Sequence, residues 1–331
     1  MSVTEAITTS TTDLPSGDPV PSSTPTPAPK PKPFPLRAVL AAAPSNVDAF
    51  LAHTQRVLQT PQGIDTALLF LCYTSRLAAS SLEALTRPAI ARSARQLLAL
   101  AASLPPSATL VFTAKAFPSS GAVAVLALAK RLRAFSALLS DARTFLRLWG
   151  LLNMYFWARR LVLKARQDKL DGKNGTGADK KEDRIETGIS WLQLSTCVVF
   201  QALENGAYLS SKGVLGWSAA AQRRAGLWSA RFWAAFVGAE VARLLYEARK
   251  RGRRTRAEKF AGGAKTAADV QRDEAEWTDA WRKSLARNLA WAPLTVHWSL
   301  EDGLLGEMAV GALASIPGVI QMRDLWRRTA E

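Results

Sequence analysis

The chain has 331 residues, with 43 Lys and Arg against 27 Asp and Glu, and a formal net charge of +16. Apolar residues make up 48% of the sequence, enough for a folded core, and the positive balance favours a polyanionic partner, either nucleic acid or a membrane with anionic lipids. Two distant cysteines, two isolated histidines and the absence of common catalytic motifs predict no disulfide framework, no metal site, no cofactor and no enzymatic activity.

Residues 1–44 are predicted to be a disordered tail. Prolines recur between Pro15 and Pro35 with Ser, Thr and Ala between them, a composition that supports neither a helix nor a core. A helix is expected to begin at Ser45, because Ser45 and Asp48 have the spacing of a capping box. No secretory signal is expected, because the first residues lack a basic start and an apolar run.

Helical periodicity continues through the rest of the chain. Apolar residues predict a second helix from Ile64 to about Leu85 and a third from Ile90 to Leu104, separated by Pro88. No stretch shows the sustained alternation of β-branched residues that is typical of strands. The predicted fold class is therefore all-α: a membrane-associated helical protein with amphipathic helices and one to three hydrophobic membrane segments.

The stretch from Lys130 to Arg166 has the most informative pattern, within an amphipathic helical region predicted over residues 45–166. Apolar residues recur at spacings of three and four, as on one face of a helix, and basic residues occupy the other face with Asp141 as the only acid. A cationic, aromatic-rich amphipathic helix is typical of a helix lying on anionic lipid, although helices of soluble bundles share the pattern. The residues expected to bind the membrane are Lys130, Arg131, Arg133, Phe135, Leu139, Arg143, Leu146, Arg147, Trp149, Arg159, Arg160, Lys164 and Arg166.

A hydrophilic linker is predicted at 167–187, followed by a helical membrane region over 188–331. Within that region, the apolar stretches 188–209 and 303–322 are each compatible with a membrane-crossing helix or a buried core helix. The last one is the stronger candidate. Its Gly311 and Ser315 have the small-xxx-small spacing that permits close helix packing.

A basic run at 249–259 lies between these two apolar stretches. Such a run is compatible with lipid binding, with nucleic-acid binding or with a solvated loop.

Four parts of the sequence carry a family pattern. They are Thr60–Asp65 with Cys72–Leu77, Leu138–Leu148, Leu203–Leu209 with Lys212–Leu215, and 303–322. In these parts the chain resembles the peroxisomal biogenesis factor 11 (peroxin-11) family in its divergent fungal form. The resemblance is closest in Leu138–Leu148, which is similar to the family's L-S-x-A-R-K-x-L-R-L element. Ile64 and Thr66 stand where the family usually has Arg and Lys.

This resemblance implies a peroxisomal membrane protein that inserts amphipathic helices into the cytosolic leaflet, elongates the membrane and promotes peroxisome division and proliferation. It also implies self-association and recruitment of the membrane-fission machinery, with anionic membrane lipids as ligands and no nucleic-acid partner. Two other functions stay open: a basic helical nucleic-acid-binding protein, and a small-metabolite channel with carboxylates such as Glu204 and Glu307 along its path.

Overall fold

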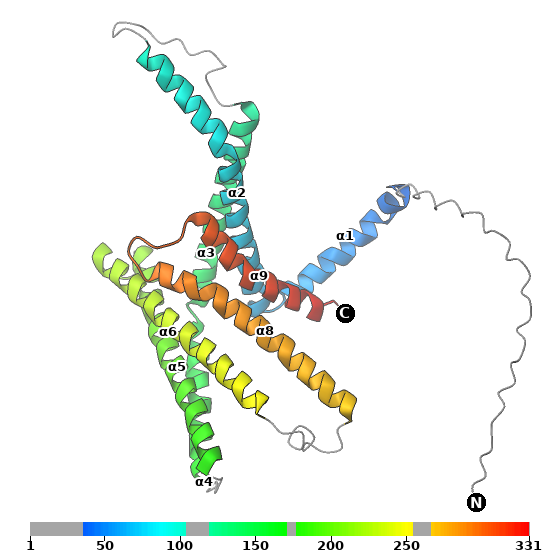
Figure 1. The fold of residues 1–331 in the computed structure, drawn as a ribbon, viewed down its shortest axis with the longest axis vertical. Coiled ribbons are helices and arrows are strands. Elements are labelled where there is room, and N and C mark those ends of the chain that lie inside the picture. The colour runs from blue at the N-terminus through cyan, green and yellow to red at the C-terminus, as the bar shows by residue number, and fades with distance from the viewer. Residues whose placement is uncertain (1–35, 104–118, 171–176, 254–265, 331) are drawn as a thin grey trace, which may run out of the picture. The chain divides into compact units, whose positions relative to one another are not determined.

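The computed structural model describes residues 36–103, 119–170, 177–253 and 266–330. Throughout these residues the regular secondary structure is helical (Figure 1), which confirms the predicted all-α class. The helices are α1 (Leu36–Leu58), α2 (Pro61–Ala102), α3 (Ser120–Arg147), α4 (Gly150–Leu170), α5 (Gly177–Ser211), α6 (Ala219–Gly252), α8 (Ala267–Trp298) and α9 (Glu307–Arg328).

The chain divides into two units, Met1–Ala49 and Phe50–Glu331. The described part of the first unit is the beginning of α1, which starts at Leu36 and not at the predicted Ser45. The predicted tail is therefore wrong for residues 36–44, where Leu and Ala residues favour a helix. The proline-rich residues 1–35 lie outside the described residues.

Several helices of the second unit begin at a hydroxyl residue that accepts a hydrogen bond from a backbone N–H of the first turn. These N-caps satisfy donors that have no partner inside the helix, which explains why the helices start where they do. At α8 the cap is a complete capping box, in which the Asp269 carboxylate also accepts from the backbone of the capping residue. The capping residues are Thr60, Ser119, Ser218 and Thr266.

Helix α2 continues through Pro88, so the prediction of two separate helices on either side of this proline is wrong. A proline inside a helix costs about 3 kcal/mol. Helix α2 packs along both α3 and α9, and this tertiary packing offsets the local cost.

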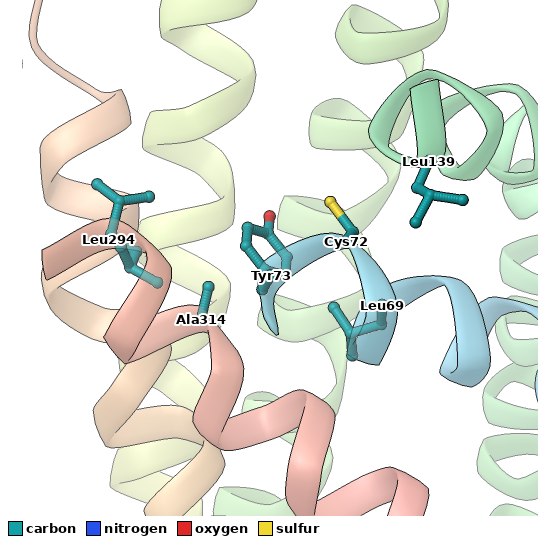
Figure 2. Packing of buried hydrophobic residues seen from close by; sticks show 7 residues of the cluster. Leu69, Cys72, Tyr73, Leu139, Leu294 and Ala314 are labelled. Atoms are coloured by element: carbon teal, nitrogen blue, oxygen red, sulfur yellow. The ribbon is translucent and has the colours of Figure 1, made fainter. Parts of the chain in front are cut away.

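Helices α2 to α9 form two packed groups, and α8 connects them through its contacts with α6 and α9 (Figure 1). In one group α2 packs against α3 and α9, and in the other α5 packs against α6 and α4. Helix α8 contacts both α6 and α9. The main core cluster takes side chains from α2, α3, α8 and α9 (Figure 2), namely Leu69, Cys72, Tyr73, Leu139, Leu294, Val310 and Ala314.

The segment 303–322 contributes most of α9, and one face of this helix is buried against α2. Gly311 approaches the backbone of α2 so closely that an added Cβ would lie 2.9 Å from the Leu77 Cα. The small residue at Gly311 thus allows α9 and α2 to come into close contact. Within the described ranges, no helix combines the length and the apolar character needed to cross a membrane.

The predicted continuous helix over 130–166 is wrong, because Leu148 and Trp149 separate α3 from α4. Helix α5 occupies the break: Asn205 Nδ2 donates to the Leu148 carbonyl oxygen at 3.1 Å. A Cβ on Gly150 would lie 2.9 Å from the Gln201 Oε1, so glycine at this position also makes room for α5.

The predicted linker at 167–187 is largely helical. Helix α4 extends to Leu170 and α5 begins at Gly177, while residues 171–176 lie outside the described ranges. Helix α5 is anchored along its length, since Lys250 on α6 bonds Glu186 and the Gln193 amide donates to Glu240.

Candidate membrane-binding surface

Leu139 and Arg143 lie in the interior, so the structure contradicts their predicted place on an exposed surface. Helix α3 turns a stripe of residues at heptad-like spacing toward the bundle, and both belong to it. Leu139 joins the core cluster, and Arg143 is only 8% exposed. The Arg143 Nε donates to the Asp65 Oδ1 at 2.9 Å, which supplies the countercharge that a buried guanidinium requires.

Arg133 and Arg147 are partly buried and paired with acids of other helices. Arg133 bonds Glu83 on α2 and, at 2.8 Å, Glu307 on α9. Arg147 holds Glu204 on α5 through two contacts of 2.7 and 3.1 Å. Hydrogen bonds to Glu83 raise the pKa of Arg133, which is consistent with a lasting positive charge in this pair.

These pairs also account for the two carboxylates that the sequence offers as marks of a channel. Glu204 of α5 binds Arg147 of α3, and Glu307 of α9 binds Arg76 of α2 and Arg133 of α3. These ion pairs hold the helices together, because each carboxylate and its arginine partner lie on different helices and neutralise each other.

The remaining predicted cations are exposed on α3 and α4. In the described part of the chain, none of them forms an ion pair, in contrast to the arginines of the buried stripe. Their charge is therefore available to an external anion. These exposed cations are Lys130, Arg131, Arg159, Arg160, Lys164 and Arg166.

Large apolar side chains are exposed on the same two helices and in the break between them. Of the predicted residues, Phe135, Leu146 and Trp149 are all exposed, and Trp149, at 71%, is the most exposed tryptophan among the described residues. The structure adds apolar residues that the sequence prediction did not include in the site, namely Leu138, Phe145, Leu152, Tyr155, Phe156 and Leu163. We refer to these exposed apolar residues and the exposed cations together as the α3–α4 surface.

On α4, apolar and cationic residues of this surface share one helix face. Leu152, Tyr155, Phe156 and Arg159 follow one another at helical spacing, and Leu163 and Arg166 continue the row. The Tyr155 and Phe156 rings meet edge to face at 5.4 Å between centroids. Arginines in such a row can extend their charged ends to the depth of lipid phosphates while the apolar side chains lie deeper. The aromatic pair three and four residues after Leu152 is the sequence signal that could have identified this face.

The two histidines hydrogen-bond to backbone groups of other segments. His53 Nε2 lies 3.0 Å from the Trp326 carbonyl oxygen, and His297 Nδ1 accepts from the backbone N–H of Leu304 at 2.8 Å. Among the described residues, no group of His, Cys, Asp and Glu could hold a metal ion.

The basic run at 249–259 is described only up to residue 253. Within that part, Lys250 bonds Glu186 and the Arg251 guanidinium lies over the Trp277 ring. Residues 254–259 lie outside the described ranges.

Comparison of the chain with protein-family models, with curated proteins and with solved structures found no match. The fold and the surface thus define a helical bundle with an exposed cationic and aromatic face, and the resemblance to the peroxin-11 family stays a prediction.

Proposed function

We propose that this protein is a non-enzymatic, membrane-associated helical protein that binds anionic membrane surfaces through the α3–α4 surface. One observation carries the proposal: cations without an ion pair in the described residues lie beside exposed aromatic and aliphatic side chains on the same two helices. Both components of an interfacial membrane-binding site are therefore present together.

The expected energies are sufficient for stable but reversible binding. Each Lys or Arg near an anionic leaflet contributes about 1 kcal/mol. Moving a large apolar side chain such as Trp149 or Phe145 out of water contributes about 1.5–3 kcal/mol. Shallow insertion of these side chains expands one leaflet relative to the other, and this expansion favours membrane curvature.

We further propose that the membrane concerned is that of the peroxisome, where the protein would promote elongation before division. The resemblance in Leu138–Leu148 and the other matching blocks supports this part of the proposal. Self-association and recruitment of the fission machinery follow from the same resemblance.

The test uses the full-length protein and sedimentation with lipid vesicles. We expect it to pellet with vesicles that contain phosphatidylserine, to pellet much less with vesicles of phosphatidylcholine alone, and to be released as salt is raised, because salt screens the charges. Equal binding to both kinds of vesicle would contradict the electrostatic part of the proposal.

A double substitution, Phe145→Gln with Trp149→Gln, tests the apolar part. Both side chains are exposed, so the fold is expected to tolerate the change while vesicle binding falls at least tenfold. Leu304→Gln is the matched control, because Leu304 is similarly exposed, at 67%, but lies in the loop before α9. A fluorescent fusion overexpressed in cells then tests the peroxisomal part, since the wild type should elongate peroxisomes and the double variant should not.

A further inference from the structure

Five helices of the second unit surround a cavity of about 690 Å³, within the usual range of small-molecule sites. Helices α2, α3, α5, α6 and α8 each turn a stripe of side chains toward it. This cavity is separate from the α3–α4 surface, because none of its lining residues belongs to that surface.

One wall of the cavity is cationic. Arg76, Arg143 and Arg147 line it, with Glu204 as the one acid among its described lining residues. The acids that pair with Arg143 and Arg76, Asp65 and Glu307, are not part of the lining. Each arginine of this wall is therefore paired, and only Glu204 among the pairing acids faces the cavity.

Two side chains on this wall have hydrogen-bond donors that can reach a ligand. Arg143 bonds Asp65 through Nε, and its two terminal nitrogens form no hydrogen bond with any described residue. Tyr73 also lines the cavity, and its hydroxyl is a second donor on this wall. Burial raises the pKa of Tyr73, against the lowering effect of the nearby Arg143, Arg147 and Arg76 charges, so the hydroxyl keeps its proton at neutral pH.

The apolar part of the cavity lining is a cluster of aromatic rings. Trp233 stacks on Trp298 with centroids 5.5 Å apart and ring planes 9° apart, and it contacts Trp291 at 5.2 Å. Phe200 stacks on the same Trp233 at 5.9 Å. These four side chains all line the cavity and provide a continuous apolar wall from α5, α6 and α8.

We propose that this cavity binds a single-chain amphipathic anion, with its carboxylate or phosphate group at Arg143, Arg147 and Tyr73 and its hydrocarbon chain along the tryptophan wall. The terminal N–H groups of Arg143 that Asp65 leaves unbonded favour an anion, and guanidinium groups bind carboxylate and phosphate in the same planar geometry. The aromatic wall requires an apolar portion as well, because an inorganic anion would leave it in contact with water. The proposal does not depend on membrane binding by the α3–α4 surface.

The test measures binding of defined probes to the full-length protein by isothermal titration calorimetry, below the critical micelle concentration of each probe. Oleate and oleoyl lysophosphatidate distinguish a free fatty acid from a lysophospholipid, and monooleoylglycerol and inorganic phosphate are the single-feature comparisons. We expect one molecule of oleate or lysophosphatidate per chain, bound at least tenfold more tightly than either comparison. No binding of either anionic lipid, or equal binding of monooleoylglycerol, would overturn the proposal.

Gly226 allows the cavity to be filled without removing a contact. It lies on α6 and lines the cavity, and a Cβ added there would meet no other atom within 4 Å. Gly226→Leu is therefore expected to fold and to weaken binding of the anionic probes at least tenfold. Gly238→Leu is the matched control, because Gly238 lies on the same helix, has equally open space and does not line the cavity.

A second variant tests the polar wall. Tyr73→Phe removes only the hydroxyl, and we expect binding of both anionic probes to weaken about tenfold, the loss typical of one hydrogen bond to a charged group. Wild-type affinity in both Gly226→Leu and Tyr73→Phe would overturn the assignment of the site. Vesicle sedimentation of both variants should match the wild type, which keeps this test distinct from that of the α3–α4 surface.

Discussion

The arginines of α3 are of two kinds, distinguished by whether an acid from another helix reaches them. Arg143 is buried and pairs with Asp65 of α2, whereas Arg131 is exposed and has no ion pair with any described residue. A buried charge without a partner is costly, and so the pair fixes the position of α3 against α2. An exposed arginine has no such role in folding and is free to contact another molecule.

We therefore expect Arg143→Met and Arg131→Met to have different effects. The first removes a buried partner of Asp65, which is itself 39% exposed, and should lower the free energy of unfolding by about 2 kcal/mol, between the values for surface and buried pairs. The second should change it by less than about 0.5 kcal/mol but weaken binding to anionic vesicles. Urea denaturation and vesicle sedimentation measure the two effects, and equal stability of both variants would contradict this division.

At this scale the sequence could predict which stretch carries the surface but not which of its residues face outward. The dense cations and aromatics of 130–166 are visible in the sequence, and most of the predicted residues are exposed. The acids that pair with Arg133, Arg143 and Arg147 lie 50, 78 and 57 residues away along the chain. No periodicity within one helix reveals partners at such distances.

Among the elements, α9 depends on the absence of a side chain at Gly311. In Gly311→Ala the new Cβ would lie 2.9 Å from the Cα and N atoms of Leu77, and the backbone of α2 cannot turn aside as a side chain can. We expect this variant to lose about 1–3 kcal/mol of unfolding free energy, the usual cost of overpacking. Gly238→Ala is the control: its Cβ meets nothing within 4 Å, and it should gain up to about 1 kcal/mol from helix propensity. Thermal or urea denaturation compares the two.

The helices themselves were largely predictable, because long amphipathic periodicity is a strong signal. The break between α3 and α4 was not, since only Gly150 marks it in the sequence while Asn205 and Gln201, which occupy it, belong to α5. Pro88 wrongly predicted the end of a helix, because the packing of α2 against α3 and α9 maintains the helix through this proline. Tertiary contacts decided both cases.

On the scale of the whole molecule, Glu307 joins three helices. It begins α9 and binds Arg76 of α2 and Arg133 of α3. Burial raises the pKa of Glu307, but hydrogen bonds and charge from Arg76 and then Arg133 outweigh this and hold it below its usual value of 4.5. The stabilisation is therefore fully present above about pH 4.5 and is lost as the pH falls through the lower pKa of the folded state.

We expect Glu307→Gln to be less stable than the wild type at neutral pH, by up to about 1 kcal/mol because the carboxylate is half exposed. This difference should shrink as the pH falls below about 4.5, since protonation of Glu307 removes the same charge. Urea denaturation across the acid range measures it. Glu301→Gln, at an exposed residue of the loop before α9, is the control and should show no such convergence.

The contact between α2 and α9 also sets an order of events during synthesis. Leu69 and Tyr73 of α2 complete their core only with Val310 and Ala314 of α9, which is made last among the described helices. At about 5–20 residues per second, α2 waits on the order of ten seconds or more at the ribosome before its partner exists. Throughout that interval its apolar face needs either a chaperone or a temporary partner, and the closest one available on the nascent chain is α3.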